Sequence, residues 1–362
     1  MRRFLLPLAA ALFALPIFAA GAALPKADAI EAGAAYIRSQ QQPGGGYASS
    51  PGQTMDAIYA LRSAGYDPAK DSVGGLTPVD YLRANAAALT SPGAAAKGAL
   101  AAKALGLDPK AVNGVDLPGL VAAAYDPDTG AYASDDFSQS IAMIGLACTG
   151  HPVEARAIDA LRATQVETDG GWGFGGGSDP DTTAVAIQAL VATGVPATDP
   201  ALVQALAYVK ASQGNDGGWG FDPSESNASS TAYVVQALIA LGEDPQAAAW
   251  EKGGVTPLEY LLSEQNTDGS FKGFDPAYAT NQALPALAGR TFCDAPQAPV
   301  TRVAPAATPT PTAVPPTITA PRPPSTGNTL AGNGSGPGLP IALGVVVLVA
   351  GSAAVAAMRR RG

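Results

Sequence analysis

The chain reads LVQALAYVKASQGNDGGWGFDPSESNASSTAYVVQALIALG over residues 202–242. An Ala- and Leu-rich stretch comes first, and a Gly-rich loop with one tryptophan follows it. A second, strongly apolar stretch then ends at Gly242. Glycine in this place is typical of a helix C-terminus, where the backbone needs a positive φ. The stretch therefore predicts two helices, over 202–212 and 232–241, joined by a loop.

The same unit recurs six times within residues 29–290. The glycine that ends each second helix marks the units, at Gly65, Gly106, Gly150, Gly194, Gly242 and Gly289. The intervals of 41, 44, 44, 48 and 47 residues are typical of two-helix repeats. The pattern predicts further first helices over 155–164 and 257–264, and a second helix over 184–193.

The two helices of a unit differ in polarity, which predicts how they are layered. The second helices are apolar nearly all round and should be buried. The first helices carry the charged residues Arg38, Arg156, Asp159, Arg162, Lys210 and Glu259. Alternating inner and outer helices predict an all-α fold, an (α/α)6 toroid of six two-helix repeats. An open solenoid also fits a repeat array, but six units without polar capping repeats favour a closed ring.

The loops between the helices share a second pattern, Gln-x-x-x-Asp-Gly-Gly-Trp or a close variant. Its paired glycines permit a tight turn, and its Gln and Asp side chains can bond backbone groups at helix ends. Weaker copies occupy 41–47 and 128–132, and the second unit lacks the pattern over 90–97. We assign a structural role to Gln165, Asp169, Trp172, Gln213, Asp216, Trp219, Gln265, Asp268 and Phe271.

This spacing resembles the glutamine–tryptophan repeats of squalene cyclases and protein prenyltransferase β-subunits, over residues 30–290. The resemblance implies the (α/α)6 toroid, with loops that stabilise it. It also implies two chemistries. Zinc-dependent prenyl transfer uses Asp, Cys and His ligands, whereas this chain has one histidine, His151, in a turn, and no Asp-x-Cys pair. We therefore exclude that chemistry and expect neither a metal nor a cofactor.

Squalene cyclases protonate an alkene with the acidic motif D-x-D-D-T-A, and residues 179–184 read DPDTTA. The resemblance implies Asp181 as proton donor, with Asp179 as the other catalytic candidate. Thr182 replaces the next acid, which weakens the case because neighbouring carboxyls tune such an acid. The alternative, which we favour, is that Asp181 caps a helix. Small polar residues hold the corresponding point of other units at Thr54, Ser138, Ser229, Ser230 and Thr280.

A weaker resemblance links residues 281–292 and 137–152 to the cobalamin carriers related to intrinsic factor, and implies a secreted binding toroid. Aromatic residues make up only 6% of the chain, which argues against a cation-stabilising cyclase cavity. We therefore expect a non-catalytic, monomeric toroid that binds an unknown hydrophobic ligand or extracellular partner. The predicted ligand residues, at the end where the inner helices begin, are Asp56, Asp181, Ser230 and Tyr233. The alternatives are a class II terpene cyclase relative that uses Asp181 as general acid, and a structural spacer or adhesin.

The chain ends predict export and anchoring. The segments are a signal peptide (1–23), the toroid (24–295), a Pro/Thr/Gly-rich stalk (296–338), a transmembrane helix (339–358) and a cytoplasmic basic tail (359–362). Residues 324–327, PSTG, resemble a sortase signal without its leucine and would attach the chain through Thr326; retention as a plain membrane anchor is the alternative. We expect the toroid on the outer face of the cell membrane or in the cell wall.

Charge and cysteine content limit the partners. The body has 14 basic and 30 acidic residues, so it should not bind nucleic acid through phosphate neutralisation. Outside the cell Cys148 and Cys293 could form a disulfide. The alternative is a free core thiol at Cys148, and the sequence leaves this open.

Overall fold

The computed structural model describes residues 26–302, apart from residues 49 and 223, and the regular elements in that part of the chain are helices. Isolated β-bridges occur within its loops. The α-helices are α1 (Lys26–Ser39), α2 (Pro51–Ser63), α3 (Pro78–Asn85), α4 (Pro92–Ala104), α5 (Leu117–Ala123), α6 (Asp136–Cys148), α7 (Ala155–Ala163), α8 (Pro180–Ala192), α9 (Pro200–Ala211), α10 (Ala228–Leu241), α11 (Pro257–Ser263) and α12 (Pro276–Leu287). Short 3-10 helices are η1 (Pro68–Lys70), η2 (Ala86–Ala88), η3 (Ala248–Trp250) and η4 (Ala295–Gln297).

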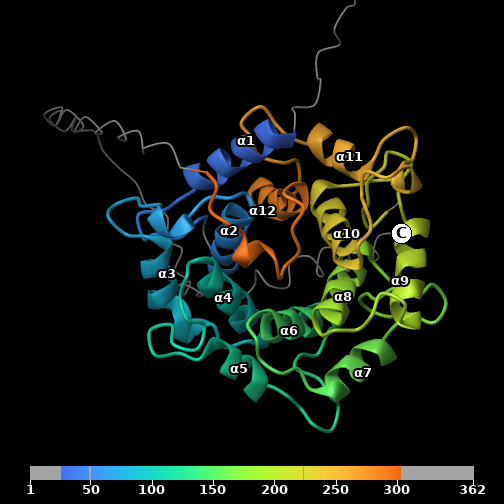
Figure 1. Ribbon diagram of the computed structural model, residues 1–362, viewed down its shortest axis with the longest axis horizontal. Coiled ribbons are helices and arrows are strands. Elements are labelled where there is room, and N and C mark those ends of the chain that lie inside the picture. Colours follow the sequence, from blue (N-terminus) through green and yellow to red (C-terminus); the bar gives the residue numbers. More distant parts are fainter. Residues whose placement is uncertain (1–25, 49, 223, 303–362) are drawn as a thin grey trace, which may run out of the picture.

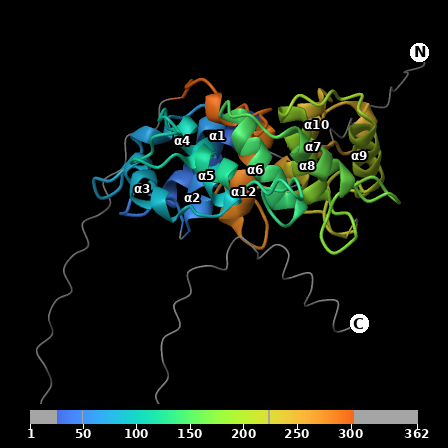
Figure 2. The same ribbon diagram turned by 90° about the horizontal axis from the view of Figure 1, so that it is seen from below.

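The even-numbered helices form an inner ring and the odd-numbered helices surround it (Figure 1). Each inner helix packs against the next, and α12 packs against α2, which closes the ring. Seen from the side, the molecule is a flattened disc (Figure 2). The predicted all-α closed toroid is thus confirmed, and the open solenoid is excluded.

Local sequence explains where the inner helices begin and end. Each begins after a small polar residue whose side chain accepts a backbone N–H of the first turn; these N-caps are Ser50, Ser91, Asp135, Asp179, Asn227 and Asp275. Each ends at the predicted glycine, which has a positive φ in all six units. Helices α8 and α10 start four residues earlier than predicted, because Asp179 and Asn227 are their caps.

The Gly-rich loops connect neighbouring units. In the loop before α10, Gln213 Nε2 donates to the carbonyl of Gly217 in its own loop and, at 2.7 Å, to the carbonyl of Trp250 in the next unit. The indole of Trp219 is fully buried and donates to the Val209 carbonyl at the end of the outer helix. The Trp219 backbone N–H donates to Thr231 Oγ1 on the inner helix. One loop therefore fastens its own two helices and the following repeat.

The same geometry closes the ring between the last repeat and the first. Gln265 Nε2 donates to the carbonyl of Ala29 in α1 at 2.8 Å, across 236 positions of sequence. In the fourth unit, Gln165 reaches the Ala201 carbonyl of the next outer helix. Gln41, in the weaker first copy, bonds only the Gly45 carbonyl of its own loop.

The chain continues past α12 into the centre of the ring (Figure 1). We call residues 290–302 the C-terminal plug. Its η4 packs against α2 and α4, and the backbone N–H groups of Thr301 and Arg302 both donate to the Gly65 carbonyl. A disulfide joins Cys293 of the plug to Cys148 at the end of α6. Residues 296–302, the start of the predicted stalk, thus lie against the ring.

The other predicted end segments lie outside the described residues. They are the signal peptide, the rest of the stalk with Thr326, the transmembrane helix and the basic tail. Within the described residues, the structure has no helix with the length and apolarity that a membrane span requires.

Candidate functional site

The N-terminal ends of the inner helices surround one opening of the ring, which we call the acid mouth because Asp136, Asp179 and Asp181 lie there. Asp179 is the N-cap of α8 and accepts hydrogen bonds from the backbone N–H and the hydroxyl of Thr182, at 2.8 and 2.9 Å. Asp181 is the second residue of the helix, and its Oδ1 is buried without a hydrogen-bond partner. The interpretation of Asp181 as the cap is therefore wrong, because Asp179 holds that role.

The residues compared with Asp181 are not caps either. Ser138 and Ser230 donate their backbone N–H groups to the caps Asp135 and Asn227. Thr54 and Thr280 lie further inside their helices and receive the backbone N–H of the loop aromatics Tyr47 and Phe271, as Thr183 and Thr231 do for the two tryptophans. The four threonines therefore attach the loops to the inner helices, whereas the two serines contact the caps.

The environment of Asp181 favours its neutral form. Burial, followed by the charge of Asp179, raises the pKa of Asp181 to about 7, and a hydrogen bond with Ser230 opposes the shift. Burial also raises the pKa of Asp179 and of Asp136, the first residue of α6. These effects outweigh the helix dipole, which stabilises a carboxylate at an N-terminus. Asp181 is thus protonated in a substantial fraction of the molecules at neutral pH.

Aromatic rings fill the centre of the ring beneath Asp181. Tyr233 packs edge-on against Phe137, at 6.0 Å between ring centroids, and is stacked on Phe292 of the plug at 6.2 Å. Phe292 also packs against Tyr59, at 5.6 Å. The hydroxyls of Tyr233 and Tyr278 lie 2.7 Å apart. Burial, together with the charges of Asp181 and other nearby acids, raises the pKa of Tyr278, so its hydroxyl stays neutral.

Our sequence reasoning missed four of these aromatics, namely Tyr59, Phe137, Tyr278 and Phe292. An alignment of the inner helices could have found two of them. Phe137 is the second residue of α6, the position that Asp181 holds in α8, and Tyr278 is the third residue of α12. Phe292 carries no such signal because the plug lies outside the repeats. The low aromatic content of the chain therefore misled us, since the few aromatics are concentrated in the ring.

The predicted ligand residues all lie on inner helices, at two depths. Ser230 is beside Asp181 at the acid mouth, and Tyr233 lies one turn deeper. Asp56 is deeper in the ring, where its Oδ2 accepts from Lys97 Nζ at 2.9 Å and both side chains are more than 90% buried. The ring interior is thus more polar than its Ala-rich helices suggest.

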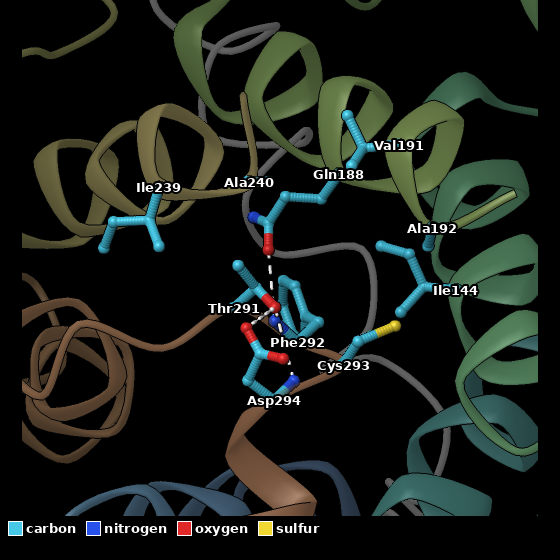
Figure 3. Close-up of a pocket in the computed structure, with 10 residues that line it drawn as sticks. All are labelled: Ile144, Gln188, Val191, Ala192, Ile239, Ala240, Thr291, Phe292, Cys293 and Asp294. Carbon is cyan, nitrogen blue, oxygen red and sulfur yellow. Dashed lines mark hydrogen bonds between the residues drawn. The ribbon is translucent and has the colours of Figure 1, made fainter. Parts of the chain in front are cut away.

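Two cavities flank this interior without reaching Asp181. One of about 220 Å³ lies beside the plug, at the opposite opening of the ring, which we call the plug mouth (Figure 3). The other, about 290 Å³, lies outside the ring between α9 and η3. No group of three or more His, Cys, Asp or Glu residues in the described part of the chain could hold a metal ion.

Comparison with known proteins agrees with this architecture. The family model of the squalene-hopene cyclase C-terminal domain matches residues 123–286, a range that includes Asp179 and Asp181. The squalene–hopene cyclase of Zymomonas mobilis is 32% identical over 145 residues, which are 36% of this chain and 21% of that protein. The type II terpene cyclase MstE from Scytonema matches in structure with a TM-score of 0.56, at 15% identity, over 73% of this chain and 97% of that chain.

These matches support a relationship to the terpenoid cyclase-like superfamily over residues 123–286. Sporulenol synthase of Bacillus subtilis is a further relative, 27% identical over 159 residues, which are 40% of this chain and 24% of that protein. The matched part of the chain thus spans about a fifth to a quarter of the length of these curated relatives. The likeness to MstE shows the shared fold.

Proposed function

We propose that the toroid is a class II terpene cyclase relative in which Asp181 is the general acid. The observation that carries the proposal is the state of this side chain. Asp181 stands at the acid position of the family motif, its pKa is about 7, and its buried Oδ1 has no partner. A general acid works best when its pKa is near the working pH, because it is then both protonated and able to release the proton.

The surrounding residues support the same chemistry. Asp181 would transfer its proton to one carbon of an isoprenoid double bond, and the other carbon would become a cation. The π electrons of further double bonds then form the ring bonds, and loss of a proton to water ends the reaction. The faces of Phe137 and Tyr278, which are only partly buried, can stabilise the cation. Asp179 assists because its charge raises the pKa of Asp181.

The packing of the ring restricts where the substrate binds. Tyr233 is fully buried and Phe292 is 2% exposed, so they occupy the centre of the toroid. Phe137 and Tyr278 are only partly buried and lie nearer the acid mouth. We therefore expect the reacting double bond to enter from the acid mouth and to meet Asp181 before it meets the plug.

The test is an assay of the full-length protein with squalene and with geranylgeranyl substrates, with products identified by gas chromatography and mass spectrometry. We expect a cyclised product, and we expect Asp181→Asn to reduce its rate of formation by about 10²–10⁴-fold, the usual effect of losing a general acid. Thr182→Asp, which restores the second acid of the motif, should increase the rate. Absence of product from both the wild type and Thr182→Asp would contradict the proposal, and so would an Asp181→Asn variant of unchanged activity.

A second candidate is the non-catalytic toroid that binds a hydrophobic ligand or partner at the acid mouth. Two observations favour it, the replacement of the second acid by Thr182 and the packed centre of the ring. Saturable isoprenoid binding that survives Asp181→Asn, with no product in either protein, would favour binding over catalysis. Absence of both binding and turnover would favour the structural spacer or adhesin.

We also propose that the toroid is displayed outside the cytoplasmic membrane. The predicted signal peptide, membrane segment and terminal arginines support this, as does the Cys148–Cys293 disulfide, because disulfides persist in oxidising compartments. Protease added to intact cells should then remove the toroid. If Thr326→Ala releases it from wall-linked material, the chain is sortase-attached; if the variant stays with the membrane as the wild type does, the plain anchor holds. Full protection from protease would contradict display.

A further inference from the structure

The cavity at the plug mouth combines apolar walls with the polar side chains of Gln188, Thr291 and Asp294. Ile144, Val191 and Ile239, on three neighbouring inner helices, supply apolar walls, and Phe292 of the plug closes another side (Figure 3). Ile239 and Ala240 are partly exposed and Asp294 is exposed, so the cavity opens to solvent at this edge. The cavity exists because the plug lies against α8 and α10, and it involves none of the residues proposed for catalysis.

Gln188 places an unused hydrogen-bond donor in this cavity. Its side chain is 3% exposed, and its Oε1 accepts the backbone N–H of Phe292 at 3.1 Å. That bond fixes the orientation of the amide, because only the oxygen can accept from an N–H. The amide nitrogen, Nε2, then has no partner. Figure 3 shows both cavity and amide, with the nitrogen turned away from Phe292. A buried donor without a partner carries a free-energy cost that a ligand acceptor would remove.

The volume limits the size of such a ligand. An apolar cavity of about 150 Å³ in another protein binds benzene, which has six non-hydrogen atoms. In proportion, a cavity of about 220 Å³ has room for roughly nine. The walls are apolar on several sides, so the body of the ligand should be compact and hydrocarbon-like.

We propose that the plug-mouth cavity binds a compact cyclic molecule of this size that carries one hydrogen-bond acceptor, such as a cyclic ketone. Its oxygen accepts from Gln188 Nε2, and its ring packs against Ile144, Val191 and Phe292. This site is separate from the acid mouth, so it can be tested whether or not Asp181 proves catalytic.

Two probes that differ in a single group test the assignment with the full-length protein. Cyclooctanone presents a ketone oxygen, and methylenecyclooctane has the same ring with CH₂ in place of oxygen. Ligand-observed NMR titration should give a dissociation constant of about 0.1–1 mM for the ketone, a typical affinity for so small a ligand. The hydrocarbon should bind at least about tenfold more weakly, since it leaves Gln188 Nε2 unpaired.

Three variants test whether the two probes bind in the plug-mouth cavity. Gln188→Leu should bring the affinities for the two probes to within about twofold of each other, a change in selectivity that a general loss of structure would not produce. Ala240→Leu should fill the cavity and abolish binding of both probes. Ala35→Leu, the same substitution at an exposed position of α1 that lines neither cavity, should bind cyclooctanone like the wild type. The proposal is overturned if the wild type binds neither probe, if it binds both equally, or if Ala240→Leu retains the wild-type affinity.

Discussion

The two mouths of the toroid contain different chemistry and are stabilised by different interactions. At the acid mouth, hydrogen-bonded Gly-rich loops hold helix N-termini together, and three carboxyl groups with raised pKa values lie among partly buried aromatics. At the plug mouth, a non-repeating segment enters the ring and a disulfide ties it to α6. The repeats therefore build the ring and one open mouth, whereas a single added segment closes the other. Breaking each set of interactions in turn tests this division.

The largest effect on stability should come from the plug mouth. Cys293→Ser removes a cross-link between residues 145 positions apart and should lower the free energy of unfolding by roughly 2–5 kcal/mol. Denaturant unfolding without added oxidant or reductant, which leaves the wild-type disulfide intact, measures the change. Cys148→Ser and the double variant should give the same loss, and a reducing agent should destabilise the wild type alone. A loss below about 0.5 kcal/mol would show that the plug is held without the disulfide.

The acid mouth should respond to pH in the opposite sense to an ordinary carboxylate. With a pKa of about 7, Asp181 keeps its proton in the folded chain over a range where the unfolded chain has released it. The contribution of Asp181 to stability should therefore be highest below about pH 4, fall as the pH rises towards 7, and change little above that. Asp181→Asn removes this dependence and should raise the free energy of unfolding at pH 8 by roughly 1–3 kcal/mol.

Measurement of unfolding at pH 4 and pH 8 checks the prediction. The difference between wild type and Asp181→Asn should be small at pH 4, because both side chains are then neutral. A variant less stable than the wild type at pH 8 would mean that the folded protein stabilises the charged form of Asp181.

The loops of the acid mouth should differ in how much each contributes to the free energy of unfolding. Gln265→Ala removes the bonds to Gly269 and to Ala29, the second of which closes the ring, and should cost about 1–2 kcal/mol. Gln41→Ala, the matched substitution in the first unit, removes only the bond to Gly45 and should cost about 0.5–1 kcal/mol. Thermal or denaturant unfolding of the two variants provides the comparison. Equal losses would mean that the contact between the last and first repeats adds nothing.

Asp179→Asn should have the smallest effect, a modest change in the pH dependence of activity or stability. Asparagine caps a helix as well as aspartate does, so α8 should remain intact. The substitution removes the charge that helps to raise the pKa of Asp181, so the pH at which activity or stability changes should move down by about half a unit to one unit. Asp135→Asn, at the cap of α6, is the matched control and should shift this midpoint less. An upward shift would contradict the assigned role of Asp179.

The repeats made most of the fold predictable. Recurring glycines and loop motifs identified the helices, their layering and the closed ring, because each unit repeats the same local physics. The plug could not be found this way, since residues 290–302 contain no repeat and their place in the ring depends on tertiary packing. For the same reason the sequence did not identify Phe292 as a residue of the ring centre, and it left the pairing of Cys148 with Cys293 open.

The error at Asp181 was avoidable. Proline is favoured at the first position of a helix, so Pro180 already indicated that Asp179, the residue before it, is the cap. Asp181 then had to lie inside the first turn with its carboxyl group free for another role. The raised pKa depends on burial and on Asp179, which are properties of the packed ring, and no sequence pattern could supply them.

The most direct test of the account is a titration of the Asp181 side-chain carboxyl by ¹³C NMR in the full-length protein, with Asp181→Asn to assign the resonance. If Asp181 is the proton donor, the midpoint should lie near pH 7 and should shift downward in Asp179→Asn. A midpoint below about pH 4.5 would mean that Asp181 is an ordinary ionised carboxylate at neutral pH, and it would contradict the proposal that this residue donates a proton.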